Sequence, residues 1–303
     1  MTIEETIATI LSPAKGMLVI DEHAEALVGG RGDREPAHRF TELVLSTPEL
    51  AGHVSSVLLT RHTFDAVAGR LPADRLVGVR LDTRSDPATG FSDLVRTSAS
   101  FVEWRAHVPP HEVSRGAVHI QAGILARGAA AAQSEGIVPV LTVAMPDLTQ
   151  ATIRLSQAVT SNALVALREE LDQAGADASR LLLRVNMVVA GEADPEPHDP
   201  QQVAALTLLV LERCLPGTAG VLLLSGGQPL DRACANLRAI SALAARRARP
   251  WPVTFSFCRP LVRDAAQAFS NGDTAEAARL VVESARRASE SLEPARVSDD
   301  TVA

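Results

Sequence analysis

Eight short apolar segments recur along the chain, and helical or polar stretches separate them. The segments are Met17–Asp21, Ser56–Thr60, Leu76–Asp82, Phe101–His107, Ile137–Val143, Leu181–Val189, Gly220–Ser225 and Val253–Arg259. Most of them are continuously apolar rather than alternating, which is typical of parallel strands that helices cover on the outside. Strand alternating with helix eight times predicts an α/β fold, the (β/α)8 TIM barrel.

Helices are predicted between the strands and at both ends of the chain. The stretches between strands with helical character are Ser114–Ser134, Leu148–Ala174, Pro200–Cys214, Pro229–Arg246 and Pro260–Asn271. The spacing of Thr2 and Glu5 is that of a capping box, which predicts a leading helix over one end of the barrel. A last helix is expected over Thr274–Leu292, followed by a polar, disordered tail over residues 293–303. We therefore expect one barrel domain over residues 1–303.

Composition limits the classes of partner. The formal net charge is −7 and no block of Lys or Arg occurs, which argues against nucleic acid or an anionic membrane surface. No apolar run reaches the roughly 20 residues that span a bilayer, and the acidic start of the chain is unlike a signal peptide. The three cysteines, Cys214, Cys234 and Cys258, have neither disulfide-framework nor metal-site spacing. These features predict a soluble cytoplasmic protein.

Charged residues inside strands that should be buried are the main functional signal. They are Asp21, Arg80, Asp82, Glu103, Arg105, Arg184 and Arg259. In the third and fourth strands the charges lie two positions apart, so both members of each pair point to one side of the sheet. Buried charges must be paired or must line a wet cavity. A cavity holding all of them would have an excess of one positive charge and would suit a phosphate or carboxylate; an ion-pair network filling the barrel remains the alternative.

A glycine turn follows the seventh strand and favours the anion-binding interpretation. Ser225, Gly226 and Gly227 stand between this strand and a predicted helix. Glycines allow backbone N–H groups to approach an anion closely, and the helix N-terminus adds its dipole. The loops after strands seven and eight form the usual phosphate site of such barrels, and Arg259 ends strand eight. Ser225, both glycines and Arg259 are therefore candidate phosphate ligands.

Several segments, in matching order, resemble the class I fructose-bisphosphate aldolase family over roughly Ile10 to Ser291. They are Pro13–Gly16 before Asp21–Glu22, Val102–Arg105, Gly136–Val140, Leu183–Val188, Leu224–Gln228 and Pro250–Arg259. The resemblance implies the same barrel fold, a homo-oligomer, a small anionic metabolite as ligand, and no cofactor.

Part of the family's active site is retained when its positions are transferred to this chain. The resemblance implies substrate-site roles for Asp21, Asp82, Trp104 and Arg105, which are unchanged, and for Arg80, which replaces a lysine and keeps the charge. It also implies that Ser225, Gly226 and Arg259 bind the substrate's 1-phosphate.

The catalytic positions differ from the family's pattern. The resemblance places Arg184 at the Schiff-base lysine, Glu103 at another lysine, Thr142–Ala144 at two strand-five carboxylates, and His23 and Ala26 at the distal phosphate's serines. A lysine can lose its proton and attack a carbonyl, whereas a guanidinium stays protonated. Lys15 is the chain's single lysine and precedes the first strand, at the barrel's opposite end. We therefore predict that imine chemistry is lost.

Two functions remain open, an enzyme and a binding protein. In the first, Glu103 or Asp21 acts as general acid or base, and Arg80, Arg105 and Arg184 polarise a carbonyl or carboxylate. The reaction would be a non-imine lyase, isomerase or aldol-like step on a phosphorylated or carboxylated metabolite, as in specialised biosynthesis. In the second, the chain is an inactive pseudo-aldolase that keeps the anion pocket. Fructose-bisphosphate aldolase activity itself is implied by the resemblance alone.

Two further chemistries are weaker hypotheses. Cys258 beside Arg259 is a candidate nucleophile, although a small residue filling the strand end is the favoured interpretation. Metal-assisted chemistry would use histidines near strand ends with nearby carboxylates, but none of these residues shows a recognised ligand spacing. The residues considered are His23, His62, His107 and His198, with Asp21, Glu22 or Glu196. We therefore expect no metal site.

Overall fold

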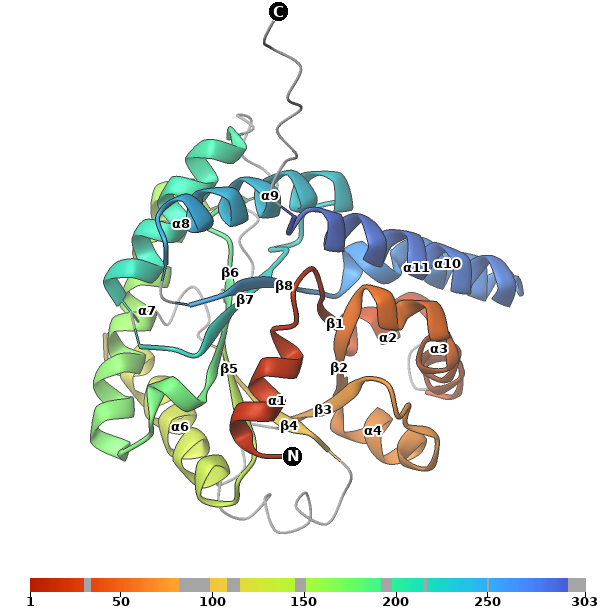
Figure 1. Cartoon of the computed structure of the whole chain (residues 1–303), viewed down its shortest axis with the longest axis horizontal. Helices are drawn as coiled ribbons and strands as arrows, with labels where there is room; N and C mark the ends of the chain where they lie inside the picture. The colour runs from red at the N-terminus through yellow and green to blue at the C-terminus, as the bar shows by residue number, and fades with distance from the viewer. Residues whose placement is uncertain are drawn as a thin grey trace, which may run out of the picture.

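A computed structural model describes residues 1–29, 34–81, 99–107, 115–144, 151–191, 198–214, 217–249 and 251–293. Parallel strands close into a barrel in the order of the sequence, with helices around the outside (Figure 1). The strands are β1 Gly16–Ile20, β2 Val54–Thr60, β3 Leu76–Leu81, β4 Phe101–His107, β5 Val138–Ala144, β6 Leu182–Asn186, β7 Gly220–Leu224 and β8 Val253–Phe257. The TIM barrel is confirmed, and each predicted strand overlaps an observed one.

The helices follow the predicted order with small differences at their ends. They are α1 Ile3–Ile10, α2 Glu22–Val28, α3 Glu35–Ser46, α4 Arg61–Val67, α6 Arg115–Ser134, α7 Ile153–Ala174, α8 Pro200–Cys214, α9 Leu230–Arg246, α10 Arg259–Ser270 and α11 Thr274–Glu290. The predicted stretches did not include α2, α3 or α4; α2 and α4 have only 7 residues each, too few for a clear helical period. Arg259 begins α10 instead of ending β8.

Two sequence expectations meet the limits of the described residues. The predicted tail lies outside them from residue 294 onward, and so does Asp82. Among the helices that the structure describes, none has both the length and the hydropathy needed to cross a membrane.

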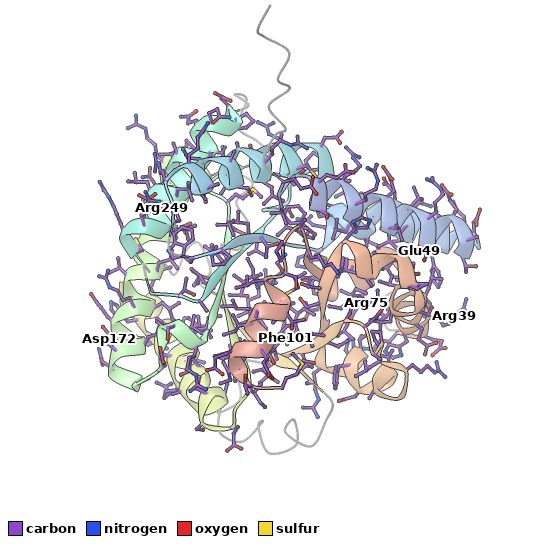
Figure 2. The ribbon with its side chains drawn as sticks, viewed as in Figure 1. Arg39, Glu49, Arg75, Phe101, Asp172 and Arg249 are labelled. Carbon is purple, nitrogen blue, oxygen red and sulfur yellow. The ribbon has the colours of Figure 1, made fainter. Side chains whose placement is uncertain are left out.

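Helix α1 closes the N-terminal end of the barrel, as its capping box predicted. The Thr2 hydroxyl accepts a hydrogen bond from the Glu5 backbone N–H at 3.2 Å, and the Glu5 carboxylate accepts one from the Thr2 N–H at 2.9 Å. The apolar face of α1 packs on barrel-interior side chains, and Figure 2 shows Phe101 beside this helix. This end of the interior is therefore apolar, which leaves the carboxyl-terminal end for polar groups.

A second apolar layer lies between the barrel and its helices, and Trp104 belongs to it. Its side chain is 1% exposed and packs with the outer core cluster, since β4 directs alternate residues to opposite faces. On α6, a Cβ added at Gly128 would stand 2.8 Å from the indole. The sequence prediction that Trp104 lines the binding site is therefore corrected: it packs against a helix.

We predict that Gly128→Ala destabilises the fold even though alanine favours helix. The added methyl group would overpack the indole, and overpacking costs about 1–3 kcal/mol. Gly116→Ala, on the same helix with open space at its Cβ, is the control and should change stability by no more than about 1 kcal/mol. Urea unfolding measures both free energies, and equal values for the two variants would contradict this packing.

Candidate active site

The structure brings five of the predicted charged residues together at the carboxyl-terminal end of the barrel. Arg80 lies on β3, Glu103 and Arg105 on β4, and Arg184 on β6, while Asp21 directly follows β1. Arg80 and Glu103 are paired across neighbouring strands in the sheet register. We call this end of the barrel, where the strands end, the mouth.

Glu103 is the centre of the cluster and is fully buried. Its Oε2 accepts a hydrogen bond from Arg80 Nε at 2.5 Å, and its Oε1 accepts one from Arg184 Nη1 at 2.5 Å. The Thr142 hydroxyl also donates to Oε1. Burial alone would raise the pKa of Glu103, but the two guanidinium groups and Thr142 lower it to about 2. We call Arg80, Glu103 and Arg184 the buried triad; its carboxylate is ionised, and both of its oxygens are occupied.

Arg184 is held from two sides and has an exposed fraction of 2%. Its Nε donates to the Ser256 hydroxyl at 2.7 Å, and its Nη1 donates to Glu103. Burial lowers the pKa of Arg184 while the Glu103 carboxylate opposes that shift, and a guanidinium in a protein remains protonated. The barrel interior therefore holds a fixed cation at this position and no amine.

The single lysine lies at the other end of the molecule. Lys15 precedes β1, on the side where the strands begin, and its Nζ donates to the carbonyl of Ala51 at 2.5 Å. The predicted placement of Lys15 opposite the mouth is confirmed.

Asp21 connects the buried triad to the mouth. It is the N-cap of α2, and its Oδ1 accepts hydrogen bonds from the His23 N–H and the Cys258 thiol, each at 3.0 Å. Its Oδ2 lies 3.4 Å from Arg80 Nη1 and 3.9 Å from Arg105 Nη1. Burial opposes ionisation, but the hydrogen bond from His23 and the charge of Arg80 hold the pKa of this carboxyl well below its usual range.

Cys258 serves Asp21 as a hydrogen-bond donor. Burial and the neighbouring Asp21 carboxylate both raise the pKa of its thiol. The thiolate that nucleophilic catalysis needs is therefore disfavoured, which supports the packing interpretation of this residue.

The predicted phosphate-binding parts lie at adjacent strand ends, because β7 and β8 are neighbours in the barrel. Gly226 and Gly227 have φ values of 62° and 86°, in the left-handed region that favours glycine. The Ser225 carbonyl accepts hydrogen bonds from the Gln228 backbone at 3.2 Å and from its side chain at 2.7 Å, which fixes the turn before α9.

Two arginines near the mouth keep free donors. Arg259 is half-buried and forms no hydrogen bond or ion pair with any other residue that the structure describes. The Nε of Arg105 is buried without a hydrogen-bond partner. Unlike the buried triad, these guanidinium groups are able to receive an anion.

The histidines that were considered as metal ligands do not gather at one place. His62 Nε2 contacts Glu25 Oε2 at 3.2 Å, and His198 precedes α8, while the side chain of His107 is outside the described set. In the described part of the chain, only Asp21, Glu22 and His23 bring three possible ligand atoms within 4.8 Å of one another. Arg80 already donates hydrogen bonds to both carboxylates of that group, so its guanidinium would compete with a metal cation for them.

Two residues of the interior network were missed as partners by the sequence reasoning. Thr142 was treated only as the replacement of a carboxylate, and Ser256 was not considered. Both are buried polar residues on continuous strands, β5 and β8, and that pattern is the signal that could have found them.

Comparisons with known proteins agree with the barrel fold. A family model described as "Fructose-bisphosphate aldolase class-I" matches residues 84–295. The chain belongs to this family. A probable class 1 fructose-bisphosphate aldolase of Xanthomonas campestris is 27% identical over 318 residues, covering 93% of this chain and 94% of the relative.

Further relatives extend the same likeness. A fructose-bisphosphate aldolase of Drosophila melanogaster is 29% identical over 294 residues, covering 86% of this chain and 80% of the relative. The solved fructose-bisphosphate aldolase of Plasmodium falciparum, in complex with TRAP and an inhibitor, superposes with a TM-score of 0.79 at 21% identity. That superposition covers 96% of this chain and 93% of the other, and it shows the shared fold.

We predict that Glu103→Gln destabilises the protein by about 3–5 kcal/mol, because it removes the carboxylate that pairs with the buried Arg184 guanidinium and one of the carboxylates that pair with Arg80. Glu276→Gln removes one partner of an exposed ion pair with Arg279 and should cost less than about 1 kcal/mol. Urea unfolding compares the variants, and a loss for Glu103→Gln as small as that of the control would contradict the buried triad.

The buried triad also predicts how stability depends on pH. The folded pKa of Glu103, about 2, lies below its unfolded value of roughly 4.3. The stability that this shift provides is present above the unfolded value and is lost as pH falls toward the folded value. The stability difference between wild type and Glu103→Gln should therefore shrink from about pH 5 to pH 2 in unfolding curves. A difference that stays constant over this range would contradict the assignment.

Proposed function

We propose that this family member binds a small phosphorylated or carboxylated metabolite at the mouth and transforms it without a lysine imine. The observation that carries the proposal is the position of Arg184, a buried cation held by Glu103 and Ser256. The chain's single side-chain amine, that of Lys15, lies at the opposite end of the barrel.

The anion would bind where donors are free. The turn at Gly226 and Gly227 leads into α9, whose N-terminus favours negative charge. Arg259 stands at the next strand end and has no partner among the described residues, so its guanidinium can form a bidentate pair with a phosphate. These groups support recognition of one phosphate or carboxylate at this side of the mouth.

Proton transfer is better assigned to His23 than to Glu103. Glu103 is enclosed by its partners, and the pKa of Asp21 is too low for a strong base at neutral pH. His23 Nδ1 lies 3.5 Å from Asp21 Oδ1, and its side chain is 55% exposed. Imidazole is the group that titrates nearest to neutral pH, and a carboxylate behind it can orient the ring. The supported reaction classes are isomerisation, elimination and a non-imine aldol-like step.

A pseudo-aldolase is the second candidate, and the closed buried triad favours it. Every oxygen of Glu103 and the Nε and Nη1 donors of Arg184 are used inside the protein. This arrangement would keep the anion site at the mouth and stabilise the barrel without any turnover.

We predict that Arg259→Gln weakens binding of dihydroxyacetone phosphate at least tenfold in calorimetric titration, because a charge-assisted phosphate contact is lost. Arg263→Gln, on the exposed face of the same helix, is the matched control and should bind as wild type does. Equal affinities in all three proteins would show that the anion binds elsewhere.

Turnover separates the two candidates. Wild type and His23→Gln are incubated with fructose 1,6-bisphosphate, which the names of the relatives suggest. They are also incubated with carbonyl compounds that carry one phosphate. An enzyme of the proposed kind converts a monophosphate, and His23→Gln lowers kcat by about a hundredfold or more. Binding without turnover of any compound supports the pseudo-aldolase, whereas an activity unaffected by His23→Gln contradicts the role of that residue.

A further inference from the structure

A cleft of about 660 Å³ lies at the N-terminal end of the barrel, opposite the mouth. The connection from α1 to β1, the end of α9 and the start of β8 surround it, and Figure 2 labels Arg249 at the end of α9. Its lining includes Lys15, Ser241, Arg249, Trp251, Thr254 and Leu292. A volume of this size falls in the range of small-molecule sites, about 300–1,000 Å³.

Among the described residues, the lining carries two cations and no carboxylate, in a chain whose net charge is −7. Lys15 Nζ donates to the Ala51 carbonyl, and an ammonium has three donors. Arg249 Nε lies 3.3 Å from Glu212 Oε1, but this carboxylate accepts its hydrogen bond from Arg247 at 3.0 Å. The lining of the cleft therefore has an excess of positive charge, and the carboxylate that pairs with Arg249 is one that it shares with Arg247.

Two buried polar atoms of the lining lack hydrogen-bond partners. They are Arg249 Nε and the Ser241 hydroxyl oxygen. Buried polar atoms are normally paired, so a group that would complete these contacts is expected nearby.

The backbone at the cleft is held in an uncommon conformation. Ala14 and Ala248 have φ values of 55° and 47°, and they are the non-glycine residues with positive φ in the described part of the chain. Both line this cleft. Such strained conformations concentrate at ligand sites.

We propose that this cleft is a second binding site, for a small organic anion whose phosphate or carboxylate carries an apolar body. Lys15 and Arg249 hold the anionic group, and the Ser241 hydroxyl donates to it. The apolar side of the cleft, which includes Leu11 and Leu292, contacts the body of the ligand. The site is independent of the proposed function at the mouth.

The single lysine gives a direct test. Lys15 and the N-terminal amine are the chain's two acylation targets, so the mass of the intact protein and of its peptides reports the labelling of each. With an N-hydroxysuccinimide ester as reagent, saturating phenyl phosphate should slow acylation of Lys15 at least fivefold and leave the N-terminal amine unchanged. An unchanged rate at Lys15 would overturn the proposal.

Matched variants test which residues are needed for phenyl phosphate to protect Lys15 from acylation. Arg249→Gln should abolish it, while Arg232→Gln, exposed at the start of α9, should retain it. Arg259→Gln should also retain it, which separates this site from the mouth. Protection that survives Arg249→Gln or that disappears with Arg259→Gln would contradict the proposal.

A second measurement covers the case in which Lys15 reacts too slowly to follow. Phenyl phosphate is titrated calorimetrically into Arg259→Gln and into the double variant with Arg249→Gln. The proposal requires one binding event in the first protein and a loss of at least tenfold in affinity in the second. No binding to Arg259→Gln, or equal binding to both, would overturn it.

Discussion

The contact between the Glu103 carboxylate and two guanidinium groups determines what the barrel interior can do. An isolated charge in a dry core is strongly unfavourable, and Arg80 and Arg184 compensate for it from two strands. Removing Glu103 would leave the buried Arg184 guanidinium without its carboxylate partner. The triad therefore fills the polar part of the barrel interior with charges that pair with one another.

Hydrogen-bond donors without a partner lie outside the buried triad. At the mouth, Arg259 follows β8 and the turn at Gly226 follows β7, while Asp21 connects the buried triad to His23. At the other end, α1 and the apolar residues around Phe101 separate the interior from solvent. The chain belongs to the class I fructose-bisphosphate aldolase family, and the charges inside its barrel are the basis of the proposal that its chemistry uses no lysine imine.

The fold could be predicted because local patterns carry it, whereas the site could be predicted only in part. Continuous apolar strands indicated the barrel, and charged residues inside those strands indicated either ion pairs or a polar cavity. Glu103 also pairs with Arg80, because the register of β3 and β4 places the two residues side by side. This register cannot be read from the residue types alone. Strand alternation places Trp104 opposite Glu103, so its outward position was available from the sequence and was overlooked. The N-terminal cleft joins segments as distant as residues 11–15 and 241–254 and leaves no local signal.

The claim that no imine can form at the barrel's centre is tested most directly by trapping with borohydride. The protein is incubated with dihydroxyacetone phosphate and sodium borohydride, and its intact mass is followed with increasing ligand. The account predicts no saturable adduct, because Arg184 carries a guanidinium and the single lysine, Lys15, lies at the opposite end of the barrel. One adduct per chain that saturates with ligand and is suppressed by fructose 1,6-bisphosphate would contradict it.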